Sequence, residues 1–128
     1  MIVLDADVLI GYLDNDDAHH DSAISLLERE IDDDFVASSL TLAEVLVGPT
    51  RAGRVLDAVH ALRDLEVSEE PLPADAAVKL AELRAATGLR MPDCCVLFAA
   101  RERQARVASW DVKLKNAARK SGLTVVTS

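Results

Sequence analysis

Two aspartates stand directly after short apolar segments, where an ionised side chain is costly unless something compensates it. Asp5 follows the apolar run Ile2 to Leu4, and Asp111 closely follows Val107 and Ala108. Both segments have the length and composition of buried strands. The carboxyl ends of parallel strands form the edge of an open α/β sheet where ligands bind. We therefore expect both carboxylates at this edge.

Two further acids are expected to point toward the same edge. Asp93 follows Pro92, and proline commonly occupies the first turn of a helix. Glu44 lies in the first turns of a predicted helix that follows a predicted strand. Four carboxylates from four distant parts of the chain would then meet at one site.

Each of these acids also has a purely structural interpretation. Asp5 and Asp111 could cap the helices that follow them, and Asp93 could interact with a helix dipole. The segment Thr41 to Glu44 matches a capping box, in which the glutamate reaches back to the start of its helix. Independent caps, however, have no reason to follow the buried strands of one sheet repeatedly. The set as a whole therefore favours a shared ligand site.

Crowded carboxylates repel one another and raise each other's pKa, and a divalent cation removes this conflict. Oxygen ligands without a convincing His or Cys partner suit Mg²⁺ or Mn²⁺ better than zinc. Such ions activate water and neutralise charge that develops on a phosphate. The pattern therefore predicts metal-dependent phosphodiester hydrolysis.

The surrounding sequence predicts alternating strands and helices, which is typical of a mostly parallel sheet covered on both faces. The predicted strands are Ile2 to Leu4, Phe35 to Ala37, Arg106 to Ala108 and Thr124 to Val126, with a further edge strand at Leu65 to Val67. The predicted helices are Ala6 to Leu13, His20 to Ile31, Thr41 to Val47, Arg51 to Leu65, Ala74 to Thr87, Pro92 to about Gln104, and Asp111 to Lys120. We expect one domain over residues 1–128.

The composition excludes several other classes of protein. No apolar run is long enough for a membrane span, and no signal peptide is evident, so a cytoplasmic protein is expected. The adjacent Cys94 and Cys95 fit neither a disulfide scaffold nor a zinc site and are predicted core residues. His19, His20 and His60 lack metal or triad spacing and are predicted to lie on the surface.

Charge is distributed unevenly along the chain, whose formal net charge is -8. Residues 1–50 carry twelve acids and one basic residue, whereas residues 84–128 carry nine basic residues and three acids. The basic C-terminal third either follows a phosphate backbone or forms ordinary solvated helix faces. With one Trp, one Tyr and two Phe in the chain, extensive base stacking is not expected.

Four segments together resemble the successive motifs of PIN-domain ribonucleases, in particular VapC-type toxins. They are Asp5 to Ile10 after the first strand, Ser39 to Gly48, Met91 to Asp93, and Ser109 to Leu114. The resemblance implies a PIN-like three-layer α/β/α sandwich with four to five short strands. It also implies that Asp5, Glu44, Asp93 and Asp111 are the acidic metal ligands, with Asp7 and Ser109 as accessory groups. Asp7 departs from the frequent Asn, Ser or Thr, and Leu114 from a frequent aromatic residue.

The same resemblance implies an Mg²⁺- or Mn²⁺-dependent endoribonuclease that cuts RNA by attack of an activated water. Such proteins usually form homodimers and are inhibited by a cognate antitoxin whose C-terminal segment covers the crevice. One alternative is a phospho-acceptor receiver domain, although no later strand ends in a convincing acceptor Asp. A second alternative is a catalytically silent PIN-like interaction module.

Overall fold

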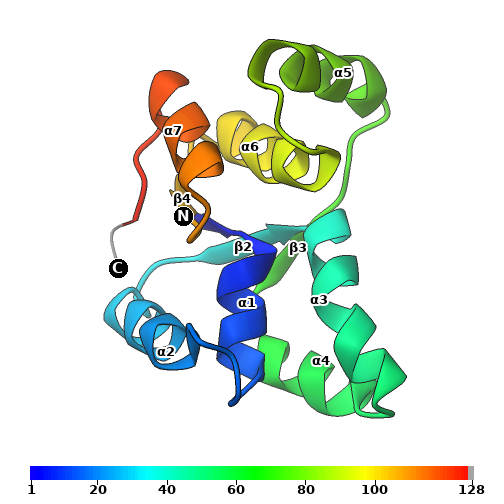
Figure 1. Cartoon of the computed structure of the whole chain (residues 1–128), viewed down its shortest axis with the longest axis vertical. Helices are drawn as coiled ribbons and strands as arrows, with labels where there is room; N and C mark the ends of the chain where they lie inside the picture. The colour runs from blue at the N-terminus through cyan, green and yellow to red at the C-terminus, as the bar shows by residue number, and fades with distance from the viewer. Residues whose placement is uncertain (127–128) are drawn as a thin grey trace.

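The centre of the molecule is a four-stranded parallel sheet, and the computed structural model describes residues 1–126 (Figure 1). The strands are β1 (Ile2–Leu4), β2 (Phe35–Ser38), β3 (Ser68–Glu70) and β4 (Arg106–Ala108). Their order across the sheet is β3-β2-β1-β4, and every neighbouring pair is parallel. All four carboxyl ends therefore lie at the same edge.

Seven helices connect and cover the strands within the described residues. They are α1 (Ala6–Leu13), α2 (His20–Arg29), α3 (Ser39–Arg51), α4 (Val55–Asp64), α5 (Ala76–Thr87), α6 (Met91–Arg103) and α7 (Val112–Lys120). Within residues 1–126, no helix is long and apolar enough to cross a membrane.

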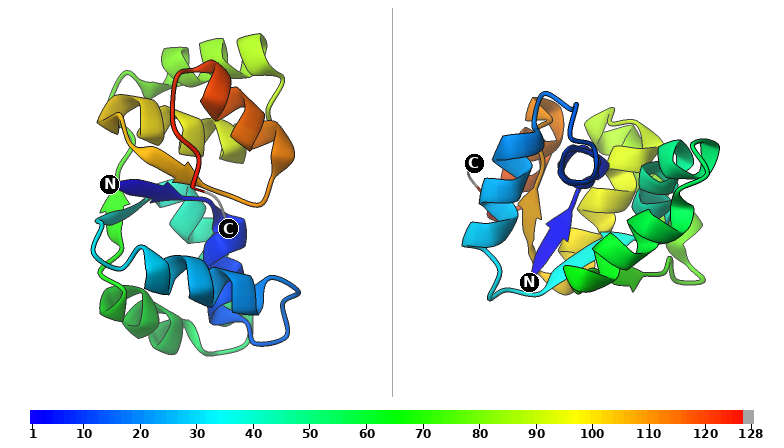
Figure 2. Two further views of the ribbon diagram at one scale, coloured as in Figure 1. Left: turned by 90° about the vertical axis from the view of Figure 1, so that its left-hand side faces the viewer. Right: turned by 90° about the horizontal axis from the view of Figure 1, so that it is seen from below.

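Side chains alternate across the sheet and build one core on each face. Val3, Val36 and Val107 point into a core shared with α5, α6 and α7, which we call the α6 core. Ile2 and Phe35 point into the opposite core, shared with α1, α2, α3 and α4, which we call the α1 core. Figures 1 and 2 show the two groups of helices on either side of the sheet. The predicted three-layer α/β/α sandwich is confirmed.

Helix α6 is the most enclosed helix of the fold. Every residue from Asp93 to Ala100 is buried, as expected for a helix that packs on several sides. Cys94 and Cys95 belong to this stretch as free thiols in the α6 core, which confirms their prediction as core residues. Asp93, in the first turn of this helix, is therefore buried together with the helix.

Two predicted strands differ from the structure. The edge strand predicted at Leu65 to Val67 is wrong, because the strand that pairs with β2 is Ser68–Glu70. Leu65 and Val67 instead pack against the α1 core from the connection before β3. The strand predicted at Thr124 to Val126 is reduced to a single parallel bridge between Val125 and Val107.

The helix boundaries also differ in places. The helix that carries Glu44 starts at Ser39 rather than Thr41 and continues through Pro49 to Arg51. The single helix predicted from Arg51 to Leu65 is divided, because a turn at residues 52–54 separates α3 from α4. Pro49 lies in the last turn of α3, and Thr50 beside it donates its hydroxyl to the carbonyl of Leu46 at 2.6 Å.

Candidate active site

Asp5 leaves β1 at the carboxyl edge of the sheet and is only 8% exposed. It is the N-cap of α1, since its Oδ1 accepts the backbone N–H of Ala6 at 2.8 Å. Its other oxygen, Oδ2, accepts the hydroxyl of Ser109 at 2.6 Å. The capping interpretation is therefore correct for one oxygen, while the other faces the end of β4.

Asp111 occupies the matching position after β4 and caps α7. Its Oδ1 accepts the backbone N–H groups of Lys113 at 2.8 Å and Leu114 at 3.2 Å. Its own backbone N–H donates to the Ser109 hydroxyl oxygen at 3.0 Å. Ser109 thus links the two acids, donating to Asp5 and accepting from the backbone of Asp111.

Asp93 lies in the first turn of α6 and is 7% exposed. Its Oδ2 lies 3.8 Å from Nε of Arg90, one turn earlier and itself largely exposed. Burial raises the pKa of Asp93, and the negative charges of Asp5 and Asp111 raise it further. Asp93 therefore shares an electrostatic environment with the acids of both strands. Arg90 is a neighbour of this site that the sequence motifs did not single out.

Glu44 is placed differently from the three aspartates, because its side chain on α3 is exposed. The capping box is not formed, since Ser38 is the N-cap of α3 and Thr41 is buried within the helix. The charge of Glu44 nevertheless contributes to the raised pKa of Asp5 and of Cys95. It stands at the border of the site.

The electrostatics of the edge are those of buried acids that repel one another. Burial is the largest cause of the raised pKa of Asp5, and repulsion from Asp111 and Glu44 adds to it. Burial and the charge of Asp5 raise the pKa of Asp7 to about 7. Oδ2 of Asp7 accepts the backbone N–H of Trp110 at 2.9 Å, but its buried Oδ1 has no hydrogen-bond partner within residues 1–126.

The donor chemistry of this edge fits a hard divalent cation, because it consists of several carboxylates whose negative charge the exposed Arg90, beside Asp93, offsets only in part. The side chains do not form a ready-made cage, since among the described residues no three His, Cys, Asp or Glu side chains are grouped as a metal-binding cluster. The structure thus brings Asp5, Asp7, Asp93, Ser109 and Asp111 into one neighbourhood, with Glu44 at its border. It does not bring their oxygens to a single point.

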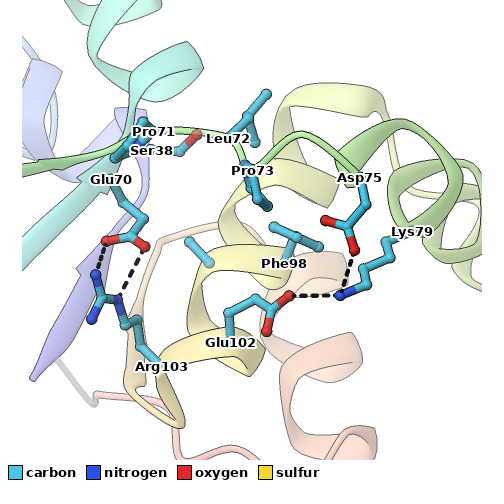
Figure 3. Close-up of a pocket in the computed structure, with 11 residues that line it drawn as sticks. Ser38, Glu70, Pro71, Leu72, Pro73, Asp75, Lys79, Phe98, Glu102 and Arg103 are labelled. Atoms are coloured by element: carbon cyan, nitrogen blue, oxygen red, sulfur yellow. Dashed lines mark hydrogen bonds and ion pairs between the residues drawn. The ribbon is translucent and has the colours of Figure 1, made fainter.

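A cavity elsewhere in the structure contains none of these residues. It measures about 400 Å³ and lies between α6 and the connection from β3 to α5 (Figure 3). Its charged side chains pair with one another: Arg103 binds Glu70 through contacts of 3.0 and 2.7 Å, and Lys79 lies 3.3 Å from Asp75 and 3.2 Å from Glu102. These mutual pairs leave the acidic edge as the better candidate for ion-dependent chemistry.

The parallel three-layer sandwich and its acidic edge define an α/β/α domain with a carboxylate site at the carboxyl ends of the strands. The family model of the PIN domain matches residues 2–120. The chain therefore belongs to the PIN domain family. No curated protein sequence gives a significant match.

Solved structures with the same fold include several toxins. A toxin–antitoxin complex from Klebsiella pneumoniae is 20% identical, with a TM-score of 0.81, and the match covers 100% of this chain and 99% of that one. VapC20 of Mycobacterium tuberculosis, described as a sarcin-ricin loop cleaving toxin, is 18% identical with a TM-score of 0.77, covering 91% and 95%. VapBC2 from Rickettsia felis, bound to promoter DNA, is 19% identical with a TM-score of 0.73, covering 98% and 97%. At these identities the similarity establishes the fold.

Proposed function

We propose that this protein is a VapC-type toxin, an Mg²⁺- or Mn²⁺-dependent endoribonuclease that hydrolyses RNA phosphodiester bonds. The observation that carries the proposal is the mutual electrostatic influence of Asp5, Asp93 and Asp111, which come from three separate segments of a PIN-family fold. The structural neighbours named as VapC toxins support this class within the family.

In this proposal Asp5, Glu44, Asp93 and Asp111 hold the divalent cation. When bound, the cation would supply the charge that activates water and neutralises the phosphate. The residues of the chain hold the acids in place. The backbone N–H of Ala6, at the start of α1, binds one oxygen of Asp5, and the hydroxyl of Ser109 binds the other.

Single Asp-to-Asn substitutions test this role cleanly. Asparagine caps a helix about as well as aspartate, so Asp5→Asn removes the negative charge and retains the cap. We expect Asp5→Asn and Asp93→Asn to abolish metal-dependent cleavage of a mixed RNA pool while the fold persists, as circular dichroism would show. Asp32→Asn, on an exposed acid of the α2–β2 connection, is the matched control and should cleave normally. Full activity of both site variants would refute the assignment.

Metal removal tests the cofactor independently. Purified protein should cleave the pool with Mg²⁺ or Mn²⁺ and should stop when EDTA is added. If the wild-type protein binds RNA but never cleaves it with either ion, the silent-module alternative replaces the nuclease. Calorimetric titration of Mg²⁺ into wild-type and Asp5→Asn protein then determines whether the acids bind cations.

A groove beside Glu44 supports an inhibitory protein partner. It measures about 380 Å³, and its lining is mainly apolar, with Ile10 and Leu13 from α1 facing Val45 and Pro49 from α3. A cognate antitoxin segment that packs apolar side chains here could extend a basic side chain to the acids and pair with them in place of metal. Co-expression with a cognate antitoxin should abolish cleavage, and Ile10→Glu should weaken that inhibition without removing catalysis.

We also propose that the protein forms a homodimer, as the family resemblance implies. Large apolar side chains remain exposed on helices, including Leu56 at 68% and Val78 at 66%. Light scattering of the purified protein measures the mass directly. A monomer at all concentrations would refute the dimer and leave the proposed nuclease activity unaffected.

A further inference from the structure

An aromatic pair lies where the α1–α2 loop meets the β4–α7 loop. The ring of His19 stacks on the indole of Trp110, with centroids 5.2 Å apart and planes inclined by 24°. Trp110 is half-buried and packs against the α1 core, whereas His19 is exposed. One face of the His19 imidazole therefore stacks on the half-buried Trp110 indole. The other face, which we call the outer face, is open to solvent.

Continuous contacts join this pair to the acidic edge. The backbone N–H of Trp110 donates to Oδ2 of Asp7 at 2.9 Å, and the same oxygen lies 3.4 Å from the Ser109 hydroxyl. Ser109 in turn donates to Asp5. Trp110 also directly precedes Asp111, so their Cα atoms are about 3.8 Å apart. The backbone that carries the indole is therefore part of the acidic edge.

The loop that carries His19 is held in this position by local contacts. The backbone N–H of His19 donates to Oδ1 of Asp17 at 2.8 Å, and Nδ1 of His20 lies 2.7 Å from the carbonyl oxygen of Gly11. A side chain at Gly11 would come within 3.3 Å of the His19 carbonyl oxygen and of Ala23. The close approach of the α1–α2 loop to α1 thus depends on a glycine. The stacked pair of His19 and Trp110, which we call the stacking platform, is formed without a bound ligand.

We propose that the outer face of His19 receives a nucleobase of a single-stranded RNA, next to the nucleotide whose phosphate lies at the carboxylates. This inference rests on the proposed nuclease function and adds a contact that positions the substrate. An uncharged base suits this location better than a phosphate, because the loop carries the acids Asp14, Asp16 and Asp17. A single platform is also compatible with a chain too poor in aromatic residues for extensive stacking.

Stacking of one base on an aromatic side chain tolerates any sequence, and its loss typically weakens binding about 5-fold to 150-fold. The test is the affinity of the protein for an adenosine octamer RNA and for an abasic octamer with the same backbone, both measured with Ca²⁺ present. We expect His19→Ala to lose most of the preference for the octamer with bases, and His19→Tyr to retain it. His60→Ala, on an exposed histidine of α4, is the matched control and should behave as wild type.

Nuclear magnetic resonance identifies the stacked ring itself. The imidazole protons of His19, identified by their absence from the His19→Ala spectrum, should shift upfield with the adenosine octamer and stay in place with the abasic one. A purely structural role for His19 would lower both affinities equally and leave their ratio unchanged. Unshifted His19 signals throughout the titration, or an unchanged ratio in His19→Ala, would overturn the inference.

These measurements need no catalysis, so the two proposals can fail separately. Wild-type protein that cleaves RNA with metal but shows no His19 shift refutes the stacking platform alone. Protein that shows the shift but never cleaves RNA refutes the nuclease and retains the base-binding surface.

Discussion

The hydroxyl of Ser109 donates a 2.6 Å hydrogen bond to Oδ2 of Asp5 and thereby joins the carboxyl ends of β4 and β1. A backbone hydrogen bond of 3.0 Å from Asp5 to the carbonyl of Ala108 reinforces the same junction. Because the hydroxyl oxygen also accepts the N–H of Asp111, one small side chain orients one buried acid and the backbone leading into another. Ser109 is therefore a positioning residue of the candidate site.

Ser109→Ala should impair metal binding through the pKa of Asp5. The Ser109 hydrogen bond favours the ionised carboxylate and counteracts burial, so its removal raises the pKa of Asp5 further. Metal ligands must be deprotonated, and the acid limb of the cleavage profile should therefore move to higher pH. A hydrogen bond to a charged group contributes about 1.5–3 kcal/mol, which corresponds to at least about a tenfold loss of Mg²⁺ affinity at a pH low enough for Asp5 to be protonated in the metal-free protein.

Ser109→Thr is the control for this prediction, because it retains the hydroxyl. Calorimetric titration of Mg²⁺ and cleavage rates from pH 5 to 9 should place it close to wild type. Identical pH profiles for Ser109→Ala and wild type would contradict the positioning role.

Asp7 should make the metal-free protein less stable as pH rises. Its pKa is raised to about 7 in the folded state, whereas an unfolded Asp titrates near 3.8. Between these two values the folded state binds the proton and the unfolded state has released it, so the free energy of unfolding falls as pH increases. Asp7→Asn removes this penalty and should stabilise the protein by about 1–3 kcal/mol at pH 8.

Urea unfolding at pH 5 and pH 8 in EDTA measures this effect. The difference between wild type and Asp7→Asn should be smaller at pH 5 than at pH 8. Asp32→Asn, in an exposed loop, should show no such pH dependence. An Asp7→Asn protein that gains nothing at pH 8 would show that Asp7 ionises without cost.

The sequence predicts those parts of the fold that depend on buried side chains. β1, β2 and β4 are apolar segments buried in two cores, and their positions follow from that pattern. β3 is different, because Ser68–Glu70 is a polar edge strand, held by backbone pairing to β2 and by polar contacts of Glu69 with Ser39 and of Glu70 with Arg103. A strand of this kind has no apolar pattern in the sequence. The prediction therefore placed the strand at the nearby apolar residues Leu65 and Val67.

The position of the three aspartates at one edge of the sheet was predictable from the sequence, but their geometry was not. Helix capping and a shared position at the sheet edge were competing interpretations of Asp5 and Asp111, and the structure shows both features together. The stacking of His19 on Trp110 joins loops about ninety residues apart in the chain, and no local sequence pattern predicts this contact. The exposure of Glu44 also depends on where α3 begins, two residues before the predicted start.

Arg106 should stabilise the fold without affecting the candidate site. It pairs with Glu30 and Asp33 through contacts of 2.8 Å each, at the amino end of β4 and thus opposite the acids. Arg106→Gln should lower the free energy of unfolding by about 1 kcal/mol, since half-exposed ion pairs contribute little. Its cleavage rate at 25 °C should equal that of wild type, and a lower rate would mean that the two edges are coupled.

The same pairing has a predictable pH dependence. The hydrogen bond from Arg106 lowers the pKa of Glu30, so the stabilisation is present above the pKa of an unfolded Glu and is lost as pH falls below it. The difference in stability between wild type and Arg106→Gln should therefore shrink between pH 5 and pH 3. A difference that stays constant over this range would exclude Glu30 as the partner responsible.

Two glycine-to-alanine substitutions should change stability in opposite directions. Gly48 lies inside α3, and a Cβ there would meet nothing within 4 Å. Alanine reduces the flexibility of the unfolded chain and should stabilise the protein by about 0.5–1 kcal/mol. Gly88 ends α5 with φ of 71°, where a side chain is strained, so Gly88→Ala should destabilise it by about 1 kcal/mol. Thermal unfolding of both variants tests the sign, and a destabilised Gly48→Ala would mean that α3 is not helical at this position.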